Sequence, residues 1–399
     1  MEELIQKSDK KISSVSLEIQ RYLLPEIDSQ NRMTIIKGAR GVGKTTMLLQ
    51  YARIIRETSD SEVLYVALDD LFFQGTSLYQ LAEEFSKKYN GHLLLLDEVH
   101  KYPGWSRELK LIYDDIPELR LVVTSSSLLD IYQSEADLSR RAVPLLLKEL
   151  SFREFLIFEK GPSFEAITLP ELLEHHRTLS HRILSEIKPL FEFYKYQQYG
   201  MYPYFLEGVT SFEDKLLRTV NLILEVDLPS VEALDYQYIV KLKKLLFAIS
   251  TSAPFTPNVS KLSERIGISR PGLIKALHYL ERARLIISIN KHNKGISILS
   301  KPDKLFVNNP NIQLALAGKH VNQGALRESF FINQIEGLYS AVLPPKGDFL
   351  IDNQYTFEIG GRGKSSRQVH GIPDSFVVKD DIENGMGNTI PLWLFGFLY

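Results

Sequence analysis

The sequence predicts an α/β protein whose N-terminal part is a doubly wound parallel sheet. Between residues 32 and 151, short apolar runs typical of buried strands alternate with amphipathic stretches typical of helices. This alternation favours parallel strands joined by helices. A glycine-rich loop at 38–43 follows the first of these strands. A strand, a glycine loop and a helix N-terminus together form an arrangement that binds phosphate groups.

Composition limits the kinds of protein that this chain can be. With 399 residues, 44% hydrophobic and 24% charged, it has the size and balance of a globular protein of several domains. The net charge of −2 provides no overall basic field for nucleic acid, although a local patch is compatible with it. The lack of cysteine excludes disulfides and suits a reducing compartment. Because no apolar run approaches the roughly 20 residues that span a bilayer, we expect a cytoplasmic protein without a membrane partner.

The glycine-rich loop matches the phosphate-binding pattern G-x-x-x-x-G-K-[ST] at every fixed position. Its residues are Gly38, Ala39, Arg40, Gly41, Val42, Gly43, Lys44 and Thr45, and Thr46 follows in the helix. We expect all of them to line a bound nucleotide. Lys44 would reach the β- and γ-phosphates, and the Thr45 hydroxyl would bind Mg²⁺. The pattern therefore predicts a P-loop NTPase with ATP and Mg²⁺ as cofactors, the alternative being a chance glycine turn before a helix.

Two acidic residues end the third predicted strand. Residues 92–98 contain four consecutive leucines, which indicate burial on both faces of a parallel sheet, and then Asp97 and Glu98. In the Walker B arrangement Asp97 would hold Mg²⁺ through water, and Glu98 would polarise the attacking water as general base. The alternative is a strand that ends in solvated acids, which the phosphate-binding loop upstream disfavours.

Polar and basic residues beside the next two predicted strands extend this candidate site. Thr124 and Ser126 follow the strand at 119–123, where their hydroxyls would contact the γ-phosphate or the lytic water. The alternative role for them is to cap a helix. Arg141, with Arg140 in reserve, precedes the strand at 143–147 and would neutralise charge in the transition state. The alternative is a pair of surface arginines.

The middle of the chain is predicted to be largely helical. Residues 152–235 are rich in aromatic side chains, which favours a packed helical lid or linker over a base-stacking surface. Residues 236–300 have the order of a winged-helix domain, with three helices and then strands at 285–290 and 295–299. The third helix and the wing carry the basic residues Arg270, Lys275, His278, Arg282, Lys291, His292 and Lys294. Duplex DNA is therefore a candidate partner, and a packing module inside an ATPase is the alternative.

Residues 301–399 are predicted to form a small α/β domain like that of restriction-type nucleases. Asp348 and, ten residues later at a strand end, Glu358 resemble the acid pair that binds Mg²⁺ in such nucleases. Those nucleases carry a lysine two residues after the second acid, where this chain has Gly360. Lys364, or less directly Arg362, is the candidate substitute. The favoured interpretation is an inactive nuclease-like or purely structural domain that is presented to a protein partner.

Taken together, these motifs resemble those of the prokaryotic AAA-type ATPases that carry a C-terminal DUF4143 domain, a domain of unknown function. The resemblance is carried by residues 38–45, 93–105, 138–155, 357–364 and 390–399. Two positions depart from the usual pattern: Ser125 replaces a glycine, and Arg362 replaces a lysine. Because an arginine does not act as a neutral base, the second departure weakens the case for a catalytic role of the loop 360–364. The resemblance implies ATP binding and hydrolysis and no particular cellular role.

Two classes of function remain open from the sequence. One is an ATP-driven switch whose nucleotide state rearranges the winged helix and the C-terminal domain, and an oligomer is compatible with it. The other is an ATP-regulated DNA-binding or nuclease-related protein, which salt-dependent binding to duplex DNA would distinguish. The predicted domains are a helical lead (1–31), an ATPase core (32–151), a helical lid (152–235), a winged helix (236–300) and a C-terminal α/β domain (301–399).

Overall fold

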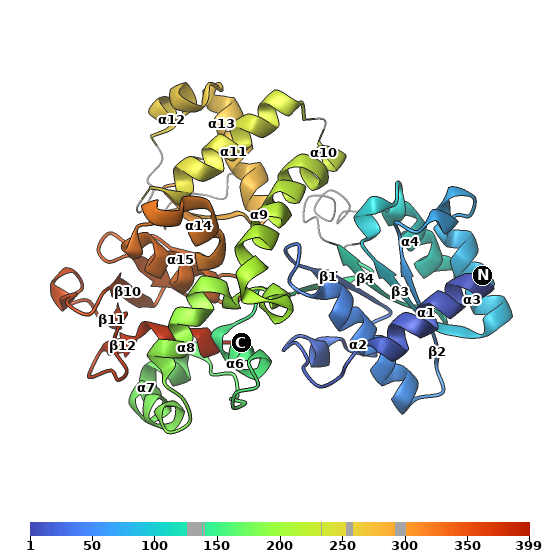
Figure 1. Cartoon of the computed structure of the whole chain (residues 1–399), viewed down its shortest axis with the longest axis horizontal. Coiled ribbons are helices and arrows are strands. Elements are labelled where there is room, and N and C mark those ends of the chain that lie inside the picture. The colour runs from blue at the N-terminus through green and yellow to red at the C-terminus, as the bar shows by residue number, and fades with distance from the viewer. Residues whose placement is uncertain (126–137, 139, 233, 253–257, 292–300) are drawn as a thin grey trace. The chain divides into compact units, whose positions relative to one another are not determined.

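The structure, a computed structural model of the whole chain, describes residues 1–125, 138, 140–232, 234–252, 258–291 and 301–399 (Figure 1). These residues form two compact units, Met1–Glu149 and Leu150–Tyr399. The boundary between the units falls two residues before the predicted end of the ATPase core. The finer division predicted for the second unit stays a prediction. Within the described ranges, none of the helices is both long and apolar enough to cross a membrane.

The first unit is an α/β fold around a parallel sheet, as the sequence predicts. Its described strands are β1 (Met33–Lys37), β2 (Glu62–Ala67), β3 (Gly91–Asp97), β4 (Arg120–Ser125) and β5 (Val143–Leu146). Their order across the sheet is β2-β3-β4-β1-β5, and every neighbouring pair is parallel. Because all the strands point the same way, the residues after β1, β3 and β4 meet at one edge of the sheet. That edge carries the phosphate-binding loop and both Walker B acids.

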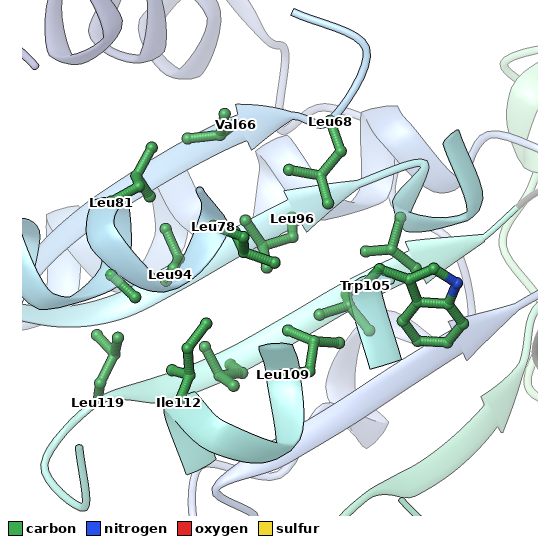
Figure 2. Close-up of a cluster of buried hydrophobic side chains, with 14 of the residues drawn as sticks. Val66, Leu68, Leu78, Leu81, Leu94, Leu96, Trp105, Leu109, Ile112 and Leu119 are labelled. Carbon is green, nitrogen blue, oxygen red and sulfur yellow. The ribbon is translucent and has the colours of Figure 1, made fainter. Parts of the chain in front are cut away.

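One face of this sheet is covered by α3 (Leu78–Tyr89) and α4 (Trp105–Asp115), which pack against each other. Figure 2 shows leucines of β3, among them Leu94 and Leu96, lying against side chains of these two helices. Ser77 and Gln80 form a capping box that starts α3: each side chain accepts the backbone N–H of the other at 3.1 Å. The sheet and the helices thus bury a continuous apolar core beneath the candidate site.

The opposite face of the sheet carries α2 (Lys44–Thr58), which starts directly after the glycine loop. Successive side chains of a strand alternate between the two faces. Since Leu94 and Leu96 point into the core beside α3 and α4, Asp97 points to the α2 face. The parallel register pairs Ala67 of β2 with Asp97, so Tyr65, two residues earlier, points to the α2 face as well.

The N-terminal segment is only partly helical, which corrects the prediction of a helical lead over residues 1–31. Helix α1 (Glu2–Ser14) ends at Ser14 and packs against the edge strand β2, where Ser8 Oγ accepts the Tyr65 N–H at 2.9 Å. The chain after Ser14 is not helical, because side chains of α2 take up its carbonyl groups. Gln50 Nε2 donates to the Ser16 and Ile19 carbonyls at 2.8 and 2.7 Å. The regular spacing of apolar residues at 15–23 therefore reflects packing of a non-helical segment.

The second unit begins with a helical region whose aromatic side chains form a core. Its described helices are α6 (Phe152–Phe158), α7 (Leu169–Leu184), α8 (Pro189–Lys195), α9 (Phe212–Leu222) and α10 (Leu228–Val231). Phe152, Phe155 and Tyr196 are fully buried and lie in contact with one another. These rings are thus packed inside the unit, which supports the prediction of a helical region with a large core over a base-stacking surface.

Three further helices match the predicted positions of the winged-helix region: α11 (Tyr236–Ser250), α12 (Val259–Ile266) and α13 (Arg270–Arg282). Strand β6 (Ile286–Ile289) follows and pairs antiparallel with β7 (Lys304–Val307). The sequence instead predicts residues 295–299 as the partner of this strand, and these residues lie outside the described ranges. The predicted pairing with residues 295–299 stays a prediction, and the pairing of β6 with β7 is an additional one that the sequence analysis does not predict.

The C-terminal part of the second unit holds a mixed sheet against which α15 (Gln323–Ile335) packs, and α14 (Pro310–Ala317) packs in turn against α15. Its described strands are β8 (Ala341–Val342), β9 (Phe349–Ile351), β10 (Tyr355–Gly360), β11 (Ser375–Lys379) and β12 (Thr389–Pro391). Strands β8, β9 and β10 are antiparallel neighbours, and β11 and β12 continue the sheet in parallel to β10. The β9–β10 turn has positive φ at both Asp352 and Asn353, which short hairpins favour.

Candidate nucleotide site

The loop between β1 and α2 has a shape that only its glycines allow. Gly41 and Gly43 have φ values of +85° and +95°, in the left-handed region that residues with a Cβ rarely adopt. A Cβ on Gly38 would come 2.4 Å from the Leu147 carbonyl oxygen, which is closer than two atoms can approach. The glycines therefore turn the chain tightly enough to bring it from the end of β1 to the first turn of α2.

Lys44 is the first residue of α2, and its side chain folds back over the loop. Its Nζ donates to the carbonyl oxygens of Gly38 and Ala39 at 2.9 and 2.7 Å, and the residue is buried. The ammonium group therefore lies against the loop that would receive the phosphates. The other predicted contacts of this region stay predictions: Arg40 is half-buried in the loop, and Thr46 is exposed in the first turn of the helix.

Asp97 is the centre of a buried hydrogen-bond network at the end of β3. Its Oδ2 accepts the Thr45 hydroxyl at 2.7 Å and the Tyr65 hydroxyl at 2.9 Å, and its Oδ1 accepts the Thr124 hydroxyl. Burial, and then the negative charge of Asp97, raise the pKa of Tyr65 well above its ordinary value. The phenol thus keeps its proton and donates to the carboxylate. Three strands and one helix N-terminus together determine the position of this one carboxylate.

The chemistry of these groups fits Mg²⁺. The Thr45 hydroxyl and Asp97 Oδ2 lie 2.7 Å apart, where the phosphate-binding loop and β3 end. Mg²⁺ prefers oxygen ligands, which come from one or two protein groups together with phosphates and water. Across the described residues, no three acidic or histidine side chains are grouped to hold a metal ion. A nucleotide-bound Mg²⁺ does not need such a group, so Thr45 and Asp97 are the residues that would hold it.

Glu98 has an unusual backbone and a charged partner. Its φ of +53° is uncommon for a residue with a side chain, and its N–H donates to Thr124 Oγ1 at 3.1 Å. Its carboxylate forms an ion pair with Lys101, whose Nζ also bonds Asp69 Oδ2 at 2.7 Å. Burial alone would lower the pKa of Lys101, but its bonds to Asp69 and Glu98 outweigh this and raise it. The hydrogen bond from Lys101 lowers the pKa of Asp69.

The structure describes one of the two residues predicted to contact the γ-phosphate or the lytic water. Thr124 is fully buried, and its hydroxyl donates to Asp97 while it accepts the N–H of Glu98. The structure thus gives it the role of joining the two Walker B acids, and a contact with the γ-phosphate stays a prediction. Ser125 is also buried and lies 3.2 Å from His100 Nδ1. Ser126 lies outside the described residues.

The structure does not bring Arg141 to the phosphate-binding loop of its own chain. Arg141 precedes β5, and the parallel register pairs Val143 with Thr34, near the start of β1. Arg141 therefore lies at the edge of the sheet opposite to the loop. There its Nε and Nη2 donate to the two carboxylate oxygens of Asp114 at 2.8 and 2.9 Å, and this hydrogen bonding lowers the pKa of Asp114. A catalytic role would require action on a second copy of the chain, and Arg140 is exposed beside it.

Comparison with known proteins agrees with this geometry. Residues 30–156 match the family model described as an AAA domain. The match begins just before β1 and ends in α6, so it includes the phosphate-binding loop and both Walker B acids. It supports nucleotide binding and ATPase activity for this part of the chain. The DUF4143 domain predicted for the C-terminal part stays a prediction.

Solved structures show only distant likeness to the AAA domain and the rest of the chain. Domain III of the replication initiation protein DnaA from Thermotoga maritima is 20% identical, with a TM-score of 0.27 over 35% of this chain and 67% of that chain. AMPPCP-bound DnaA from Aquifex aeolicus is 16% identical, with a TM-score of 0.28 over 70% of this chain and 88% of that one. PCH-2 of C. elegans is 16% identical, with a TM-score of 0.25 over 40% of this chain and 43% of that chain. Likeness at this level assigns neither partner nor role, and a comparison with curated protein sequences gives no match.

The second predicted site, in the C-terminal part, is occupied by ion pairs. Glu358 on β10 is fully buried and pairs with Lys364, while Asp348 Oδ2 accepts the Ile359 N–H at 2.8 Å. Lys304 lies 2.5 Å from Glu328 and 3.8 Å from Asp348. Burial raises the pKa values of Glu358 and Glu328. The predicted residues are therefore close in space, but two lysines take the places beside the carboxylates where a metal ion would be expected.

Sequence reasoning missed several residues of these sites. Tyr65 carries no motif, although its place on the α2 face follows from strand alternation once the register of β2 and β3 is known. Lys101 stands three residues after Glu98, a spacing that brings side chains together in a 3-10 turn. Lys304 and Glu328 come from β7 and α15, far from Asp348 in sequence. Only the fold brings them together.

Proposed function

We propose that the chain binds ATP at the loop 38–45 and hydrolyses it with Mg²⁺. The observation that carries this proposal is the convergence of four groups at the carboxyl edge of the parallel sheet. Lys44 lies over the loop, Thr45 bonds Asp97 at 2.7 Å, and Glu98 follows directly. A cation, an oxygen pair for Mg²⁺ and a carboxylate base are the parts that phosphoryl transfer to water requires.

Each residue has a separate role in this proposal. The Lys44 ammonium neutralises phosphate charge, and Thr45 and Asp97 orient the metal, which when bound neutralises charge on the phosphate oxygens. Glu98 accepts a proton from the attacking water, a role that typically contributes about 10²- to 10⁴-fold in rate. Tyr65 and Thr124 keep Asp97 in place by donating to its two oxygens. Each role follows from the chemistry of the group: an ammonium pairs with phosphate, neutral and charged oxygens bind Mg²⁺, and a carboxylate accepts a proton.

The first test is nucleotide binding. Lys44→Ala removes the cation at the phosphates and should abolish or severely weaken binding of Mg-ATP in a calorimetric titration. Lys87→Ala is the matched control, because Lys87 forms an exposed ion pair with Glu83 on α3, far from the loop in sequence. It should bind ATP like the unmodified chain. Unchanged affinity in the Lys44→Ala variant would reject the site.

We further propose that the nucleotide state switches the conformation of the second unit. The supporting observation is Arg21, which is buried and joins the loop to the last residues of the first unit. Its guanidinium donates to the carbonyl of Val42 in the loop and to the Lys148 and Glu149 carbonyls at 2.8 and 3.3 Å. A change in the loop on binding ATP would therefore reach the point where the chain enters the second unit.

Limited proteolysis tests this switch. Addition of Mg-ATP should change the rate of cleavage after residue 235 in the unmodified chain, and Lys44→Ala should lose the response. An identical cleavage pattern with and without Mg-ATP, in a chain that binds it, would reject the switch and leave ATP binding intact. A protein partner for the C-terminal part and assembly into an oligomer belong to the same proposal.

Duplex DNA is the second candidate partner, because α13 presents exposed basic side chains. Arg270 and Lys275 are exposed, while His278 and Arg282 are half-buried. Lys275 lies 3.9 Å from Glu232, and burial lowers the pKa of His278, so the positive charge on this helix is modest. Binding to duplex DNA that weakens steeply with salt would support an ATP-regulated DNA-binding protein. Absence of such binding would favour the switch alone.

A further inference from the structure

A cavity of about 670 Å³ lies at the amino edge of the parallel sheet in the first unit. It surrounds the start of the edge strand β2, and residues of α1, α2 and α3 line it together with the segment 59–61. Glu62 begins β2, and Ala67 at its other end is the register partner of Asp97, so roughly 17 Å of strand separates the cavity from the nucleotide site. The cavity is therefore distinct from that site, and its volume is typical of a small-molecule site.

The buried part of the cavity lining is apolar. Val63 and Leu64 of β2 and Phe85 of α3 are buried, while Ile5 of α1 and Tyr89 of α3 are half-buried. Leu64 and Phe85 belong to the apolar core of the unit, and Ile5 and Tyr89 pack against it. A hydrocarbon chain bound here would displace water from this surface, and the faces of aromatic rings attract cations as well.

The rest of the lining is acidic, with three carboxylates against one guanidinium. Arg56 is already engaged: its Nη1 pairs with Asp9 Oδ1 at 2.8 Å, and its Nη2 donates to the Val63 carbonyl at 2.6 Å. Asp60 and Glu62 are exposed, and among the described residues neither side chain has an ion-pair or hydrogen-bond partner. These two carboxylates are therefore available to a ligand.

Two helices end at the cavity, which adds negative potential of a different origin. Helix α2 ends at Thr58, directly before Ser59, and α3 ends at Tyr89. Ser59 and Tyr89 both line the cavity. The C-terminal end of a helix carries partial negative charge and favours a cation within about one turn. The backbone and the carboxylates thus favour the same kind of ligand.

We propose that this cavity binds a small linear aliphatic polyamine. Its ammonium groups pair with Asp60 and Glu62 beside the two helix ends, and its methylene chain packs on the apolar lining with Phe85 and Tyr89. A bare metal ion would leave the apolar lining without a partner, and an anion would be repelled by the carboxylates. An ammonium group on a methylene chain fits both parts of the lining. Binding here requires neither ATP nor its hydrolysis.

Calorimetric titration of the full chain with spermidine tests the proposal. The titration is done without nucleotide, because the phosphates of ATP would compete for the amine. One spermidine should bind per chain at physiological ionic strength, with a Kd below about 1 mM. Asp60→Asn combined with Glu62→Gln should weaken binding by about tenfold or more. Tyr89→Leu keeps an apolar side chain but removes the ring, and should weaken binding by about two- to fivefold.

The matched control removes the same charge elsewhere. Glu213→Gln combined with Asp214→Asn changes two exposed acids on α9 of the second unit and should leave the Kd within about twofold. Because Asp60 and Glu62 are exposed too, circular dichroism should show both double variants folded like the unmodified chain.

Three results would overturn the site. One is the absence of spermidine binding to the unmodified chain. Another is equal weakening in the two double variants, or no weakening in either, which would leave only general attraction to an acidic surface. The third is displacement of spermidine by Mg²⁺ at equal ionic strength, because a site that uses the methylene chain should prefer the amine.

Discussion

Replacing Tyr65 by phenylalanine removes one hydroxyl from the surroundings of Asp97 and leaves the ring in place. Tyr65 and Asp97 are each 3% exposed, and the Tyr65 hydroxyl donates to Asp97 Oδ2 at 2.9 Å. The carboxylate would then lack one of its donors in a position that water reaches poorly. Because Asp97 is expected to hold Mg²⁺, the substitution should change both the stability of the first unit and its response to the metal.

The size of both effects follows from the burial of the pair. A hydrogen bond to a charged group contributes about 1.5–3 kcal/mol, so the free energy of unfolding of the first unit should fall by about that amount without Mg²⁺. Groups that orient a metal ligand typically change metal affinity by about 10- to 100-fold. The Mg²⁺ concentration for half-maximal ATP turnover should therefore rise by about tenfold or more.

The two tryptophans allow the first unit to be followed by itself. Trp105 is in α4 of the first unit and Trp393 is in the second. In a Trp393→Phe background, the fluorescence of Trp105 during urea unfolding reports on the first unit. Tyr51→Phe is the matched control, because Tyr51 is also buried and, among the described residues, its hydroxyl has no hydrogen-bond partner. Equal stability and equal Mg²⁺ dependence of the Tyr65→Phe and Tyr51→Phe variants would refute the role of the Tyr65 hydroxyl.

Two further predictions concern the arginine and the C-terminal part. If Arg141 acts on a neighbouring copy, ATP hydrolysis per chain should rise with protein concentration, and Arg141→Ala should lose that rise. A rate that changes neither with protein concentration nor with the substitution would leave Arg141 with a structural role, which includes its bond to Asp114. The chain should not cleave plasmid or linear DNA with Mg²⁺ or Mn²⁺, because Lys364 pairs with Glu358 and Lys304 lies 3.8 Å from Asp348. Metal-dependent cleavage that is lost in both Asp348→Ala and Glu358→Ala would support an active nuclease instead.

The parallel sheet was predictable because its strands are short, apolar and separated by helices with clear ends. Helix α3 is one of the helices that separate the strands: Ser77 caps its start, and Asn90 ends it in the left-handed conformation. The segment after Ser14 was mispredicted because its apolar spacing fits a helix, while the Gln50 side chain that binds its carbonyls is remote in sequence. The pairing of β6 with β7 was not predicted for a related reason: strand pairing depends on contacts that local patterns do not contain.

The candidate site shows the same division between local and non-local information. The loop 38–45 and the two Walker B acids stand in contiguous motifs, and the fold places them at one edge of the sheet. The roles of Tyr65 and Thr124 depend on the register between strands, which the sequence does not state. Arg141 was expected near the phosphates because it is close to β5 in sequence. The direction of β5 instead places it at the opposite edge.

Phosphate release by a Glu98→Gln variant under saturating Mg-ATP tests the proposed hydrolysis most directly. Glutamine keeps the size of the side chain and much of its hydrogen bonding but removes the base. Turnover should fall by about 10²- to 10⁴-fold, while the affinity for Mg-ATP stays within about twofold of that of the unmodified chain. Turnover equal to that of the unmodified chain, with ATP bound equally well, would contradict the assignment of Glu98 as the base and the proposed mechanism with it.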